Sequence, residues 1–171
     1  MELLELKDKV LEIFHTDIEH LGNALMKTVM ENNIEKYDRF CELVENDLSV
    51  DWMQKIFQYY YANRKEKKQD YTPRSLADFV GRLTGDSDIV VDMCAGSGAL
   101  IIQRWLQNSE QKFRAFELDE KVIPFLLFNL IIRNIDSSVC RSNVLTDEKY
   151  EIWRITKGER YGCITYFKSA V

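Results

Sequence analysis

One acid and two glycines follow a short apolar run in the middle of the chain, at Asp92, Gly96 and Gly98. Glycine has no Cβ atom and adopts positive φ readily, so a ligand can approach the backbone of such a loop closely. The run Ile89–Val91 predicts a short buried strand before the loop, and the apolar residues after Gly98 predict a helix. The N-terminus of that helix would favour a ligand with an anionic group.

A second acid, Glu117, ends the next apolar run, and an acid about 20 residues after the glycines is placed to hydrogen-bond ribose hydroxyls. A dinucleotide fingerprint would need a third small residue where Ile101 stands, and no Gly-Lys-Ser/Thr of a P-loop follows. Asp92 suits a ligand with a cationic centre. The pattern therefore favours a nucleoside that is not a phosphate ester, and S-adenosylmethionine fits that description.

The elements around these residues alternate between strand and helix, which predicts an α/β fold with a parallel, doubly wound sheet and right-handed crossovers. Thr72 is expected to cap a helix that has Pro73 in its first turn. Two further strands are expected near the end of the sequence, joined by a short loop. The predicted strands are Ile89–Val91, 113–116, Val139–Val144, Tyr150–Ile155 and Tyr161–Phe167, and the predicted helices are 72–85, Ala99–Asn108 and Val122–Arg133.

The first 68 residues have helical periodicity throughout, with apolar residues at Leu4, Leu11, Ile18 and Leu25. A capping box of Thr16 and Glu19 predicts a break between two helices, and two more helices are expected over 34–45 and 52–68, the latter capped by Asp51 with Gln54. We therefore expect an all-helical segment over 1–68 and an α/β domain over 69–171. Tyr59, Tyr60 and Tyr61 are expected to pack in a helix face rather than to stack on bases.

Composition narrows the protein class. The chain has 171 residues and a net charge of −5, with no apolar run of membrane-spanning length and no signal-peptide pattern, so we expect a cytoplasmic protein. Its four cysteines form no C-x-x-C pair, and His15 and His20 have no helical ligand spacing, so no metal site is predicted.

Charge is distributed unevenly along the chain. Residues 1–51 hold 13 acids and 5 bases, whereas residues 52–171 hold 15 acids and 18 bases. Because phosphate neutralisation dominates nucleic-acid binding, any DNA is expected to contact residues 52–171. The basic run 64–68 favours a solvated helix end over a phosphate clamp.

Three segments together resemble the adenine-N6 DNA methylases of type I restriction-modification systems. They are Gln69-Asp70-Tyr71-Thr72-Pro73, Asp92-Met93-Cys94-Ala95-Gly96-Ser97-Gly98 and Phe116-Glu117-Leu118-Asp119. The resemblance implies a Rossmann-like methyltransferase fold with S-adenosylmethionine as cofactor. It implies that Tyr71, Thr72 and Pro73 flank the cofactor, that residues Asp92 to Gly98 cradle its methionine part, that Glu117, followed by Leu118, holds the ribose, and that Asn143 meets the adenine amine. Met93 and Ala95 depart from the Pro and Gly usual in that family.

The same family carries an Asp/Asn-Pro-Pro-aromatic tetrapeptide that accepts the hydrogens of the target amine and stacks on the flipped base. This sequence contains no Pro-Pro, so its catalytic residues stay unassigned. Two functions remain open. The first is an adenine-specific DNA methyltransferase, either abbreviated or completed by a partner chain. The second is a non-catalytic methyltransferase-like subunit or regulator.

Overall fold

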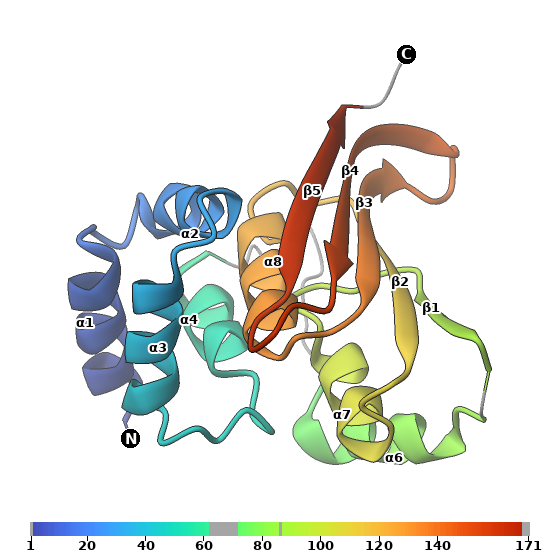
Figure 1. Ribbon diagram of the computed structural model, residues 1–171, viewed down its shortest axis with the longest axis horizontal. Helices are drawn as coiled ribbons and strands as arrows, with labels where there is room; N and C mark the ends of the chain where they lie inside the picture. The colour runs from blue at the N-terminus through green and yellow to red at the C-terminus, as the bar shows by residue number, and fades with distance from the viewer. Residues whose placement is uncertain (1, 62–71, 86, 169–171) are drawn as a thin grey trace.

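A computed structural model describes residues 2–61, 72–85 and 87–168 of the chain. Within these residues the N-terminal part, 2–61, contains four helices, and the parts 72–85 and 87–168 contain three helices and a five-stranded sheet (Figure 1). The helices are α1 Leu3–Phe14, α2 Leu21–Met30, α3 Ile34–Leu43, α4 Trp52–Tyr60, α6 Arg74–Leu83, α7 Ala99–Gln107 and α8 Ile123–Ile132. The strands are β1 Ile89–Asp92, β2 Lys112–Glu117, β3 Ser137–Asn143, β4 Glu148–Thr156 and β5 Cys163–Lys168.

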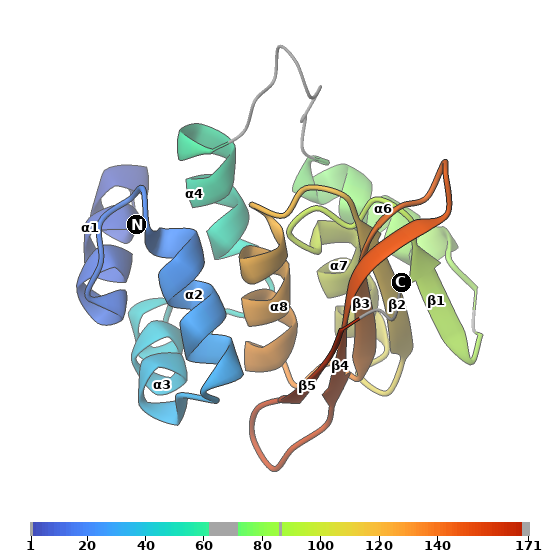
Figure 2. The same cartoon turned by 90° about the horizontal axis from the view of Figure 1, so that it is seen from above.

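Helix α8 lies at the centre of the molecule, between the N-terminal helices and the sheet (Figure 2). Every residue from Ile123 to Ile132 is buried, because a helix that is apolar on all sides must be covered on all sides. The ring of Phe128 makes edge contacts with Phe14, Tyr37 and Phe40 of the N-terminal helices. One apolar core therefore includes residues from both sides of the boundary expected near residue 68.

The strand order is β1-β2-β3-β4-β5, with β1, β2 and β3 parallel and β4 and β5 antiparallel to their neighbours. The mixed α/β class is as predicted, but the doubly wound order is wrong for the described strands, since that order requires a reversal. The links from β3 to β4 and from β4 to β5 are too short for a parallel crossover, which needs about a dozen residues. The chain end therefore extends the sheet beyond β3.

Strand β1 was expected to be buried, and the structure corrects this. Ile89 is 45% exposed and Val91 is 49% exposed, whereas Val90 packs against the core. Among the described strands β1 pairs only with β2, so it forms one edge of the sheet. Successive side chains of a strand point to opposite faces of the sheet, so Ile89 and Val91 point away from the face on which Val90 meets the core.

Two predicted helix starts also differ. Residue Pro73 is itself the cap of α6, its carbonyl accepting from Leu76 and Ala77, so Thr72 provides no side-chain cap. The capping box at Thr16 is absent, because α1 ends at Phe14 with His15 as its C-cap in the left-handed region, φ 52°, and α2 begins only after His20. The cap of α4 by Asp51 is confirmed, with Gln54 N–H donating at 2.8 Å. None of the described helices could cross a membrane.

Candidate functional site at the glycine loop

The loop after β1 takes the shape that its glycines permit. Gly96 has φ 54° and Gly98 has φ 99°, both in the left-handed region where a side chain would be strained. A Cβ atom at Gly98 would also lie 3.0 Å from Cδ1 of Leu126. The loop is attached to β2 through the N–H of Ala95, which donates to the carbonyl of Phe116 at 2.9 Å. Helix α7 then begins at Ala99.

Asp92 is the last residue of β1, and only one of its two carboxylate oxygens accepts a hydrogen bond from the described residues. Its Oδ1 accepts a hydrogen bond from the N–H of Cys94 at 3.1 Å. Its Oδ2 is buried and has no hydrogen-bond partner among the described residues. Burial raises the pKa of Asp92, and the nearby charge of Glu117 raises it further. A buried oxygen of this kind is costly unless a donor reaches it, so the site is suited to a cationic or N–H-bearing ligand group.

Glu117 joins the ends of β1 and β2. Its Oε2 accepts from the N–H of Gly96 at 2.8 Å, and its Oε1 accepts from the N–H groups of Leu118 at 2.9 Å and Asp119 at 2.8 Å. These bonds fix the carboxylate at the carboxyl edge of the sheet. Each carboxylate oxygen offers about two lone-pair positions, so Oε2 retains capacity for a further donor.

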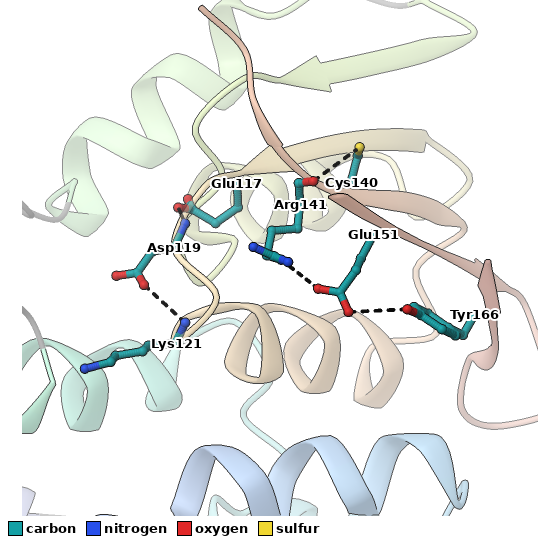
Figure 3. Close-up of polar contacts among 7 residues, drawn as sticks. All are labelled: Glu117, Asp119, Lys121, Cys140, Arg141, Glu151 and Tyr166. Carbon is teal, nitrogen blue, oxygen red and sulfur yellow. Dashed lines mark hydrogen bonds and ion pairs between the residues drawn. The ribbon is translucent and has the colours of Figure 1, made fainter. Parts of the chain in front are cut away.

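A cavity of about 460 Å³ is lined by residues of α2, of the start of α8 and of strands β3 and β4. Arg141, the register partner of Glu117 on β3, donates from Nε to Oε2 of Glu151 at 2.6 Å, and the hydroxyl of Tyr166 donates to Oε1 of Glu151 at 3.4 Å (Figure 3). The lining residues combine aromatic and charged side chains, and they are Glu19, Gly22, Asn23, Met26, Tyr61, Glu120, Lys121, Ile123, Pro124, Arg141, Glu151 and Trp153. Sequence reasoning missed Arg141 and Glu151, although Arg141 stands only two residues before the predicted Asn143.

The predicted site residues differ in how they are placed. Met93 and Cys94 in the loop and Leu118 after β2 are exposed, while Ala95 in the loop is buried. Asn143 ends β3 and its Oδ1 accepts from the N–H of Leu145 at 3.1 Å, which makes it part of a turn.

The predicted element before α6 is only partly described. Thr72 is half-buried and Pro73 is exposed, while Tyr71 and the basic run 64–68 lie outside the described residues. Asp92, Glu117 and Asn143 nevertheless end three adjacent strands, β1, β2 and β3, at one edge of the sheet.

Ser97 faces away from the open side of the loop. It is 1% exposed, and its hydroxyl donates to Oδ2 of Asp51 at 2.6 Å. Its side chain therefore anchors the loop from within the protein, a role that the motif did not reveal. In the described part of the chain, no group of three or more His, Cys, Asp or Glu side chains could hold a metal ion.

Comparison with protein families gives one match. Residues 44–159, more than half of the chain, match the family described as N-6 DNA Methylase. The matched region contains the glycine loop, Glu117, Asn143 and the segment with Asp51. No curated protein and no solved structure matches the chain.

Proposed function

The chain belongs to the N-6 DNA methylase family, and we propose that it binds S-adenosylmethionine at the glycine loop as methyl donor for the N6 amine of adenine in DNA. The observation that carries this proposal is the buried, unpartnered Oδ2 of Asp92 beside two glycines in the left-handed region. The ammonium group of the methionine part would donate to that oxygen. The start of α7 favours the carboxylate of the same ligand.

Glu117 supports the ribose part of this proposal. Its carboxylate is held by the three N–H groups of Gly96, Leu118 and Asp119, so it needs no reorganisation to accept from a ribose hydroxyl. Leu118 is 52% exposed next to it and offers an apolar surface to the adenine ring. Met93 through Gly98 would surround the methionine part, and Thr72, Pro73 and Asn143 would border the cofactor.

Bound S-adenosylmethionine supplies an electrophilic methyl group on a sulfonium centre. This chain's residues would hold that group at the edge of the sheet with its methyl directed toward an incoming amine, so their contribution is orientation. Residues 52–171, with their positive balance, are the part proposed to contact DNA.

We propose that groups outside residues 1–171, such as those of a partner chain, accept the amine's hydrogens, because residues 1–171 contain no Pro-Pro motif. The open edge of β1 supports this assignment, since β1 leads directly into the glycine loop and pairs only with β2 among the described strands. A partner docked there would bring its own groups beside the methyl donor.

Isothermal titration calorimetry with S-adenosylmethionine and with S-adenosylhomocysteine tests the cofactor proposal. We expect both ligands to bind the wild-type chain and Asp92→Ala to abolish or strongly weaken the binding. Glu159→Ala is the matched control, because it removes one acid from an exposed position in the β4–β5 loop. Absence of heat with both ligands at millimolar concentration, together with no rise in melting temperature, would overturn the proposal.

A further inference from the structure

We propose that Asp51 is a positioning residue for the cofactor loop: the N-terminal helices, through Asp51 and Ser97, set the conformation in which the glycine loop binds its ligand. This inference rests on the proposed binding of S-adenosylmethionine at that loop. It assigns to the helical segment a role in ligand affinity that neither the glycine motif nor the family match indicates.

The contact between the two segments is direct and buried. Asp51 precedes α4, 46 positions before Ser97 in the chain, and its Oδ2 accepts from the Ser97 hydroxyl at 2.6 Å. Its Oδ1 accepts from Gln54 N–H and from Nδ2 of Asn129, both at 2.8 Å. Asn129 Nδ2 also donates to the carbonyl of Ser97 at 2.9 Å, so side chain and backbone of Ser97 are both held.

A buried arginine fixes the other side of this cluster. Arg133, the C-cap of α8, donates from Nη1 to Oδ1 of Asn129 at 3.0 Å, from Nε to the carbonyl of Leu48 at 2.9 Å and from Nη2 to the carbonyl of Val50 at 2.9 Å. Asn129 therefore accepts from a cation on one side and donates to an anion on the other, which leaves it a single orientation.

The segment before Asp51 is tied to α7 as well. Nε2 of Gln103 donates to the carbonyl of Ser49 at 3.0 Å. The segment 48–51 is thus bound both to α8 and to the helix that starts at the glycine loop, and it forms a support beneath that loop.

The charges in this cluster depend on each other. Burial raises the pKa of Asp51, while Arg133 and the hydrogen bonds from Ser97 and Asn129 oppose that rise. Burial lowers the pKa of Arg133 to about 10, and the charge of Asp51 opposes that fall. Each charge would be costly without the other, so the cluster is stable only when complete. Such a cluster favours one arrangement of the groups it connects.

The position of Ser97 explains why ligand affinity should depend on its hydrogen bond to Asp51. Ser97 stands between Gly96 and Gly98, the two residues with the greatest backbone freedom in the loop. A loop with two glycines has many conformations. A ligand that binds only one of them binds more weakly, because ordering the loop on binding costs conformational entropy. The buried hydroxyl of Ser97 removes that freedom before the ligand arrives.

The test compares Ser97→Ala with Thr28→Val. Both substitutions delete one buried hydroxyl, since Thr28 is 1% exposed and donates from Oγ1 to the carbonyl of Ala24 at 2.8 Å within α2, away from the loop. Both should lower the melting temperature. Only Ser97→Ala should weaken S-adenosylmethionine binding, by about tenfold, measured by calorimetry well below either melting temperature.

Two further measurements separate positioning from stability alone. Amide hydrogen exchange of the ligand-free chain should be faster over residues 93–98 in Ser97→Ala and unchanged there in Thr28→Val. In a double-mutant cycle, Asp51→Asn and Ser97→Ala should be less than additive in affinity, because they act through one bond.

The outcomes distinguish the two proposals. If wild type fails to bind S-adenosylmethionine, the proposed function is wrong and this inference falls with it. If wild type binds and Ser97→Ala binds equally well, the proposed function stands and this inference is overturned, because the Asp51 cluster then serves only the stability of the fold.

Discussion

The N–H of Gly96 donates to Oε2 of Glu117 at 2.8 Å, so the acid that ends β2 holds the loop that follows β1. An acid at this position was predicted to hydrogen-bond the ribose hydroxyls of the ligand. In the structure it also satisfies three backbone donors, and the loop and the second acid form one unit.

Substitution of Glu117 should therefore affect both binding and stability. In Glu117→Gln the amide nitrogen cannot accept from Gly96, and a backbone donor loses its partner, at a cost of about 1–3 kcal/mol. We expect a lower melting temperature and weaker S-adenosylmethionine binding by calorimetry. Glu159→Gln, at an exposed position, is the control and should change neither. Full affinity and stability in Glu117→Gln would contradict the role of this carboxylate.

The glycine at 98 should be intolerant of a side chain. Gly98→Ala places a Cβ atom 3.0 Å from Leu126 at φ 99°, and the left-handed conformation alone costs about 1–2 kcal/mol. Denaturant unfolding should show that loss. Gly22→Ala is the matched control, since Gly22 lies in α2 and its added Cβ would meet only Phe125 at an ordinary 3.9 Å, so helix propensity predicts a small gain. Equal effects of the two substitutions would show that the loop has no special backbone requirement.

The ionised form of Asp92 should lower the free energy of unfolding of the ligand-free protein. Its pKa is raised in the folded chain, so the folded state binds its proton more tightly than the unfolded state does. The penalty is fully present above the raised pKa and disappears as the pH falls toward the ordinary carboxyl value of 3.8.

Asp92→Asn should accordingly raise the melting temperature of the ligand-free chain at pH 7, and the gain should shrink as the pH is lowered. The same variant should lose S-adenosylmethionine affinity, because an amide presents a donor to the ligand's ammonium group. Thermal unfolding across pH measures the first effect and calorimetry the second. A pH-independent gain would mean that the carboxylate is not strained by its burial.

Those parts of the candidate site that depend only on neighbouring residues in the sequence could be predicted from it. The apolar run before Asp92, the two glycines and the acid at Glu117 are where they were predicted, because strand, turn and helix signals act over a few residues. The bond from Ser97 to Asp51 spans 46 positions and belongs to no motif, so the sequence showed only the capping role of Asp51. Strand order is equally non-local, which explains why alternating elements predicted a doubly wound sheet while the short links after β3 produced an antiparallel extension.

DNA binding, if it follows the charge distribution, should depend on the basic run before the predicted cofactor element. Replacement of Arg64, Lys65, Lys67 and Lys68 by Gln should weaken duplex binding by a similar factor on all sequences. The slope of the logarithm of the binding constant against the logarithm of the salt concentration should also become less steep, by about 0.9 for each phosphate that the variant no longer neutralises. Fluorescence anisotropy over a range of salt concentrations measures both. Unchanged binding would assign the DNA interface to other cations of residues 52–171.

The isolated chain should not methylate adenine at a rate typical of its family. Tyr161, Tyr166 and Phe167, near the end of the sequence, are the candidates to stack on a target base, and the side chains of Tyr161 and Tyr166 already make hydrogen bonds within the protein. Tyr161 is buried with its hydroxyl donating to Asp38 at 2.7 Å, and the hydroxyl of Tyr166 donates to Glu151. Phe167 is 50% exposed on β5, but neither neighbour in the sequence is an Asp or Asn that could accept the amine's hydrogens.

Loss of such preorganised acceptors costs about 3 kcal/mol or more, which is roughly two orders of magnitude in rate. Transfer of a radiolabelled methyl group to unmodified duplex DNA is the direct measurement, made on the chain alone and after addition of any protein that co-purifies with it. We expect little turnover alone and recovery with a partner that supplies the acceptors. Robust turnover by the isolated chain, abolished by Asp92→Ala and retained by Glu159→Ala, would mean that groups within this chain accept the amine's hydrogens and that no partner is needed for catalysis.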